Sequence, residues 1–90
     1  GENILMKDIE WIDSDYAEFQ KYGFSSAFLN SLNEFYTAKK NFLLFPNEDT
    51  RYEMKFLFQH VHSALKSECA KHIISPYKLQ ILTELLKRGV

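Results

Sequence analysis

Residues 52–72 carry two separate sets of apolar and aromatic side chains, each with helical spacing. The larger set recurs at steps of three and four and consists of Met54, Leu57, Phe58, Val61 and Leu65. Such spacing places side chains on one face of an α-helix. The second set lies nearly opposite and consists of Tyr52, Phe56 and His60. Because a surface helix needs only one apolar stripe, we expect a central helix that is contacted on two sides or keeps one side for a partner.

The first half of the chain contains the signals for two further helices. Asp15 and Glu18 have the spacing of a capping box, in which side chains bond the free amides of a first helical turn. Gly23 is expected to end this helix because glycine adopts the left-handed conformation without steric cost. Ser25 is expected to cap the next helix. Residues 1–12 are then an arm or an extra helical turn.

The second half of the chain has its own start signals. Thr50 and Glu53 have the spacing of a second capping box. Ser75 is a predicted N-cap, and Pro76 fits the first helical position, where its missing N–H costs nothing. Gly89 is expected to stop the last helix.

The predicted end of the second helix combines cations with bulky apolar residues. Lys39 and Lys40 fall near its C-terminus, where the helix dipole favours positive charge, and a phosphate site is the alternative. Four apolar residues then run from Phe42 to Phe45, just before Pro46. We expect them to close one end of the molecule, and the alternative is an exposed docking knob.

Together these patterns predict an all-α fold, a single domain of residues 1–90 arranged as an antiparallel four-helix bundle with short connections. The expected helices span about residues 14–22, 25–42, 50–71 and 76–88. The residues expected to be deeply buried are Leu32, Phe35, Phe58, Val61, Leu65, Leu82 and Leu85. Apolar content of 46%, with 16% aromatic residues, is sufficient for one core in a chain of this length.

The distribution of charge and cysteine bears on packing and location. Residues 1–49 contain nine acidic and four basic residues, whereas residues 50–90 contain three acidic and seven basic ones. We therefore expect the first segment to lie against the C-terminal helices.

A single cysteine cannot form an internal disulfide, and no apolar run approaches the length of a membrane span, so we expect a cytoplasmic protein in a reducing compartment without an integral membrane segment.

The sequence lacks the common signatures of catalysis. It contains no glycine-rich phosphate loop, no nucleophile elbow and no His-Glu-x-x-His motif. Cys69 and His72 are three residues apart, so both can point the same way from one helix, and His60 and His62 lie on the same segment. Because zinc needs three or four such ligands, we expect no metal, no cofactor and no enzymatic activity.

Nucleic acid is also not an expected partner. Residues 75–89 resemble the helix that leads into the winged helix-turn-helix of MarR-type repressors. The sequence ends where the DNA-reading helix would begin, and its net charge of −1 lacks the basic footprint of a DNA-binding protein.

The remaining function is protein binding through an aromatic helix face. Large, rigid aromatic side chains are the usual anchors of interfaces, and fourteen aromatic residues exceed what a core of this size needs. The candidate contact residues are Tyr52, Phe56, His60 and Phe45. Two outcomes are open for the helix face itself. We expect the N-terminal arm, through Ile4, Leu5 and Trp11, to cover it, and the alternative is that it stays exposed for a partner.

Two interpretations of this binding module and one of a different class follow. The chain is a domain of a larger protein, such as a bacterial effector, or a small cytosolic binding protein similar in size and helix number to bacteriocin immunity proteins. The different class is a small metal-binding or enzymatic domain that uses Cys69 and His72.

Overall fold

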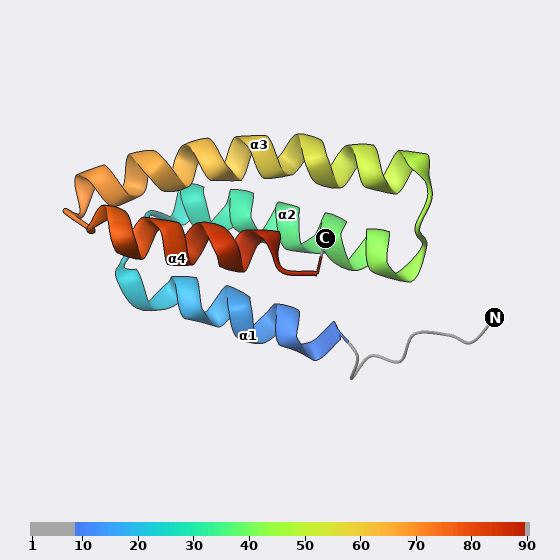
Figure 1. Ribbon diagram of the computed structural model, residues 1–90, viewed down its shortest axis with the longest axis horizontal. Helices are drawn as coiled ribbons and strands as arrows, with labels where there is room; N and C mark the ends of the chain where they lie inside the picture. The colour runs from blue at the N-terminus through green and yellow to red at the C-terminus, as the bar shows by residue number, and fades with distance from the viewer. Residues whose placement is uncertain (1–8, 90) are drawn as a thin grey trace.

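The computed structural model describes residues 9–89, and this part of the chain contains helices and no strand. The elements are α1 (Glu10–Phe19), a short 3₁₀ turn (Gln20–Tyr22), α2 (Ser26–Leu44), α3 (Glu48–Lys71) and α4 (Pro76–Lys87). Successive helices run in opposite directions, and α1 and α3 lie on opposite sides of the bundle (Figure 1). The predicted all-α, four-helix antiparallel fold is confirmed.

The helices differ in length, and this difference shapes the molecule. α2 and α3 have 19 and 24 residues, whereas α4 has only 12. The α2–α3 hairpin therefore extends well past the end of α4, as Figure 1 shows. One end of the hairpin is covered by α4, and the other projects from the bundle with the α2–α3 turn at its tip.

Three of the predicted helix boundaries have the expected chemistry. Ser25 accepts a hydrogen bond from the Phe28 amide, and Ser75 accepts one from the Lys78 amide. Gly23 has a φ of 73°, in the left-handed region where glycine has no steric penalty. These short-range signals operate within one turn, which is why the sequence alone locates them.

The two predicted capping boxes are wrong. α1 begins at Glu10, so Asp15 lies inside the helix and is buried rather than capping its start. α3 is capped by Asn47, whose side chain accepts from the Thr50 amide at 2.9 Å while Thr50 Oγ1 accepts from the Asn47 amide at 3.1 Å. Thr50 is thus the N3 residue of a capping box whose N-cap is Asn47, and Glu53 takes no part in this box.

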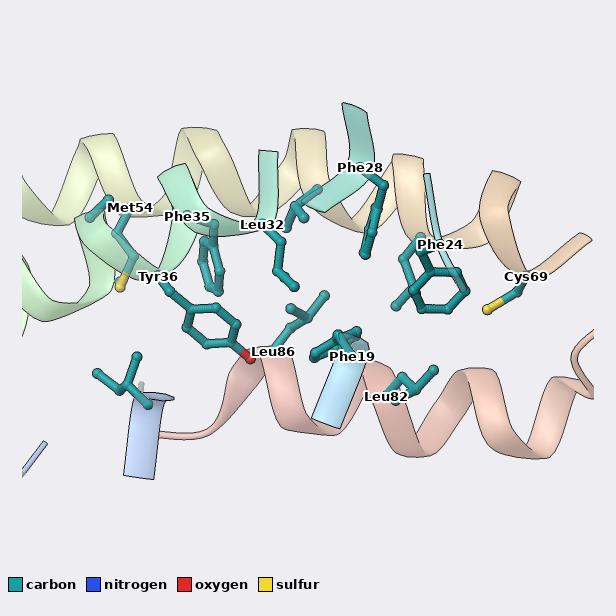
Figure 2. Close-up of a cluster of buried hydrophobic side chains, with 14 of the residues drawn as sticks. Phe19, Phe24, Phe28, Leu32, Phe35, Tyr36, Met54, Cys69, Leu82 and Leu86 are labelled. Carbon is teal, nitrogen blue, oxygen red and sulfur yellow. The ribbon is translucent and has the colours of Figure 1, made fainter. Parts of the chain in front are cut away.

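The core lies between the α2–α3 hairpin and the pair α1 and α4 (Figure 2). Five of the seven predicted core residues are buried: Leu32, Phe35, Val61, Leu65 and Leu82. The prediction is wrong for Phe58 and Leu85, which are only partly buried. Phe58 stacks on His62 at the border of a surface hollow, and Leu85 lines a groove between α1 and α4.

Lys39 is fully buried and closes the C-terminal end of α4. Its ammonium donates to the carbonyl oxygens of Leu86 and Arg88, each at 2.7 Å. Burial lowers the pKa of Lys39 to about 8. Both carbonyls and the negative end of the α4 dipole favour the ammonium form, so we assign a positive charge at neutral pH. The sequence predicted that Lys39 interacts with the C-terminus of its own helix, α2. In the structure it binds the carbonyl oxygens at the C-terminus of α4.

Glu68 makes the equivalent connection at the opposite end of the bundle. Its carboxylate accepts hydrogen bonds from the amide of Ser25 at 2.9 Å and from the hydroxyl of the same residue at 3.0 Å, which satisfies the start of α2. Lys71 lies 3.1 Å from the second carboxylate oxygen. The pKa of Glu68 is lowered from its ordinary 4.5 to about 2, mainly by the hydrogen bond from the Ser25 amide. Lys71 and the Ser25 hydroxyl lower it further.

Replacing Leu65 should reveal the contribution of the core. Leu65→Ala removes a side chain with 0% exposure, so it should lower the free energy of unfolding by about 2–5 kcal/mol through lost burial and the cavity that remains. The exposed neighbour change Gln59→Ala is the control and should cost under about 0.5 kcal/mol. Chemical denaturation measures both, and equal losses would contradict the assigned core.

Glu68→Gln should change both stability and its pH dependence. A folded pKa below the ordinary value means that Glu68 stabilises the protein fully above about pH 4.5 and loses this effect as the pH falls toward 2. The variant should be less stable at neutral pH by about 1.5–3 kcal/mol, the usual value of hydrogen bonds to a charged group. Its stability should also fall less between these pH values. Parallel pH profiles for the two proteins would argue against this role.

Candidate functional site

The candidate surface begins with three ring side chains on the outer side of α3. We call Tyr52, Phe56 and His60 the aromatic ridge. The Tyr52 and Phe56 ring centroids are 6.4 Å apart and nearly parallel, and the Phe56 and His60 rings meet edge to face at 5.0 Å. Tyr52 is 71% exposed and Phe56 is 50% exposed. One ring per turn therefore forms a continuous aromatic strip that faces solvent.

The expectation that the N-terminal arm covers the aromatic ridge is not met within residues 9–89. Trp11 lies at the end of α4, where its ring centroid is 4.9 Å from the Arg88 guanidinium and 5.6 Å from the Lys39 ammonium. α1 runs on the side of the bundle away from α3 (Figure 1), so it cannot bring Trp11 to the ridge. Ile4 and Leu5 lie outside the described residues.

Phe45 is the fourth candidate, and it lies in the turn between α2 and α3. The preceding residues Phe42, Leu43 and Leu44 are partly buried against the core, so most of this apolar run closes the end of the hairpin as expected. Phe45 itself is 62% exposed. Its carbonyl accepts from Thr50 Oγ1 at 2.8 Å, which fixes the turn that presents the ring. No ring contact joins Phe45 to the aromatic ridge among the residues that the structure describes.

An open groove of about 900 Å³ lies between α2 and the first half of α3. Ala38, Leu44 and Leu57 supply its apolar surface, and its polar lining includes the carboxylates of Glu34, Asp49 and Glu53. Among the described residues, Lys40 is the one basic side chain in the lining, and Asp13 takes up that charge at 2.8 Å. The groove is therefore acidic.

A smaller hollow lies between this groove and the aromatic ridge. It measures about 290 Å³ and is lined by Phe56 and His60 of the ridge together with Ser31, Glu34 and Leu57. Because Glu34 and Leu57 also line the large groove, the two depressions are adjacent. The other flank of α3 is different in charge, since Lys55 borders an apolar hollow there with Lys87 of α4. The ridge thus divides an acidic flank from a basic one.

The thiol and imidazoles of α3 do not come together as a site. Cys69 is 2% exposed, and burial raises the pKa of its thiol, which disfavours the reactive thiolate. His72 lies 3.6 Å from Glu68 and packs edge to face on Phe24. His62 stacks on Phe58, and its pKa is lowered by burial and then by two nearby lysines. Among residues 9–89, no three His, Cys, Asp or Glu side chains are placed to hold a metal ion.

A buried polar cluster near the end of α4 was missed at the sequence level. Arg88 donates to Asp15 Oδ1 at 3.1 Å, which is an instance of the expected attraction between the acidic first half and the basic second half. Asp15 Oδ2 and the Tyr36 hydroxyl are buried without a hydrogen-bond partner among the described residues, and burial raises both pKa values. Lys39, beside them, has 0% exposure. Since no substrate can reach that ammonium, the cluster holds the helices together.

The sequence contains a signal for this cluster. Asp15 is three residues after Ile12 and four before Phe19, so it falls on the buried stripe of α1. Lys39 is four residues after Phe35 and three after Tyr36, so it falls on the buried stripe of α2. A charged residue on an apolar stripe needs a buried partner, and this is the rule that would have identified both.

Comparison with protein-family models, curated proteins and solved structures finds no match for this chain. None of the described helices is long and apolar enough to cross a membrane. The surface geometry therefore supplies the functional argument.

The exposure of Phe56 leads to a stability prediction. Phe56→Ala should leave the melting temperature nearly unchanged, with a loss of stability below about 1 kcal/mol, because half of the side chain already contacts water. Phe35→Ala, at 1% exposure, is the matched control and should cost about 3–5 kcal/mol. Thermal denaturation measures both. Comparable losses would mean that a part of the chain covers the aromatic ridge in solution.

Proposed function

We propose that this chain is a non-enzymatic helical module that binds another protein through the aromatic ridge and the adjoining turn at Phe45. The observation that carries the proposal is the uninterrupted row of solvent-facing rings on α3. Soluble proteins seldom leave contiguous apolar patches exposed unless the patch has a partner. Tyrosine and phenylalanine are also among the side chains enriched at the centres of interfaces.

The rigidity of α3 favours binding. Met54, Val61 and Leu65 fix the inner face of the helix against the core, and Glu68 anchors its C-terminal part to the start of α2. A partner therefore meets rings on a helix whose backbone is already ordered. Binding to a pre-organised surface loses less conformational entropy than binding to a flexible one, so more of the contact energy contributes to affinity.

An intracellular location belongs to the same proposal. The only cysteine of the chain is free and buried in α3. Small secreted domains usually rely on disulfides, whereas this fold is supported by an aromatic core.

Affinity purification from the cells that make the protein tests the proposal. Three tagged proteins should be compared: the natural sequence, Phe56→Ala, and Tyr77→Ala, which changes a 74% exposed ring on α4. A specific partner should be retained by the natural protein and by Tyr77→Ala and lost from Phe56→Ala at unchanged melting temperature. The same set of bound proteins in all three samples would refute the proposal.

A further inference from the structure

We infer that the partner presents a basic amphipathic segment, which lies in the groove between α2 and α3 and directs lysine or arginine side chains at Glu34, Asp49 and Glu53. This inference rests on the proposed function and specifies the chemistry of the partner. It follows from the size of the aromatic ridge, the charges beside it and the adjacency of the two depressions.

The aromatic ridge is too small to be a complete interface. A stable protein–protein interface buries about 800 Å² on each partner. Three ring side chains that bury at most about 150–250 Å² each, and that are already partly covered, supply less than this. A partner seated on the ridge must therefore extend over one of its flanks. The acidic flank offers about 900 Å³ of open groove, whereas the hollow on the basic flank measures about 190 Å³.

The charges of the groove select the partner. Glu34, Asp49 and Glu53 form no ion pair within residues 9–89, although the structure pairs other surface acids such as Glu18 with Lys21. Lys40, the cation in the groove lining, is bound to Asp13 instead. Three unpaired carboxylates around one groove attract a cationic segment and repel an anionic one. The same charges oppose nucleic acid and anionic membrane surfaces.

The spacing along α3 sets the length of the segment. Asp49 and His60 are eleven residues apart, which corresponds to about 16 Å of helix axis. Asp49 and Glu53 are one turn apart and reach basic side chains at the same spacing on a partner helix. Leu44 and Leu57 receive apolar side chains, and the exposed faces of Phe56 and Tyr52 accept a lysine or arginine by cation–π contact. A partner helix of about three turns therefore fits the site.

Selection from a random peptide library tests the inference even while the natural partner is unidentified. Peptides of about 16 residues displayed on phage should be selected on the immobilised protein, and their affinities measured by fluorescence anisotropy. We expect the selected peptides to be enriched in lysine and arginine at helical spacing. Binding should weaken at least about 10-fold in Phe56→Ala, as for an interface hot spot.

A pair of charge-matched variants isolates the groove. The triple change Glu34→Gln, Asp49→Asn and Glu53→Gln should weaken peptide binding at least about 5-fold at low salt and less at high salt, where ions screen the attraction. The control triple Glu10→Gln, Glu18→Gln and Glu84→Gln alters net charge equally. Two of its residues line the groove between α1 and α4. It should change affinity less than about 2-fold. Circular dichroism melts confirm that both triples are folded.

The outcomes of these experiments separate this inference from the proposed function. Neutral or acidic peptides that lose binding in Phe56→Ala would overturn the inference and leave the ridge as a binding surface. Peptides that are insensitive to Phe56→Ala, or no peptide above background, would overturn both. Sedimentation of the free protein tests a second copy as occupant. A dimer that Phe56→Ala dissociates would replace the basic partner by self-association.

Discussion

The ammonium of Lys39 is the point at which three helices of this protein are joined. It extends from α2, binds two carbonyl oxygens at the end of α4 and lies against the ring of Trp11 in α1. α4 has only twelve residues, and this terminal connection adds to the burial of Leu82 and Leu86 in holding it. Arg88 adds a bond to Asp15 at the same place. A buried charge of this kind is tolerated because its donors meet carbonyl oxygens and aromatic faces.

Glu68 performs the complementary task at the other end of the bundle. Lys39 satisfies the free carbonyls at the end of one helix, and Glu68 satisfies the free amide of Ser25 at the start of another. Both side chains belong to the long hairpin and bind helix termini. The two buried charges of the hairpin thus hold the C-terminus of α4 at one end of the bundle and the N-terminus of α2 at the other.

Within residues 9–89, this arrangement leaves the outer side of α3 uncovered. α1 and α4 pack on the inner side of the hairpin (Figure 1), and Tyr52 and Phe56 on α3 stay exposed. The acidic groove lies between the two helices of the hairpin, next to the aromatic ridge. In the proposed function, the aromatic ridge supplies an apolar anchor and the acidic groove a preference for a basic partner.

The sequence by itself determined the helices, their order and most of the core, because helical spacing and caps such as Ser25 and Gly23 act within a few residues. It also identified the aromatic ridge as a second stripe. Only the tertiary structure decided that the described helices leave the ridge open, since its cover depends on where α1 packs. The pairings of Lys39 and Asp15 were likewise hidden, because their partners are 47 and 73 residues away and local pattern carries no information about such distances.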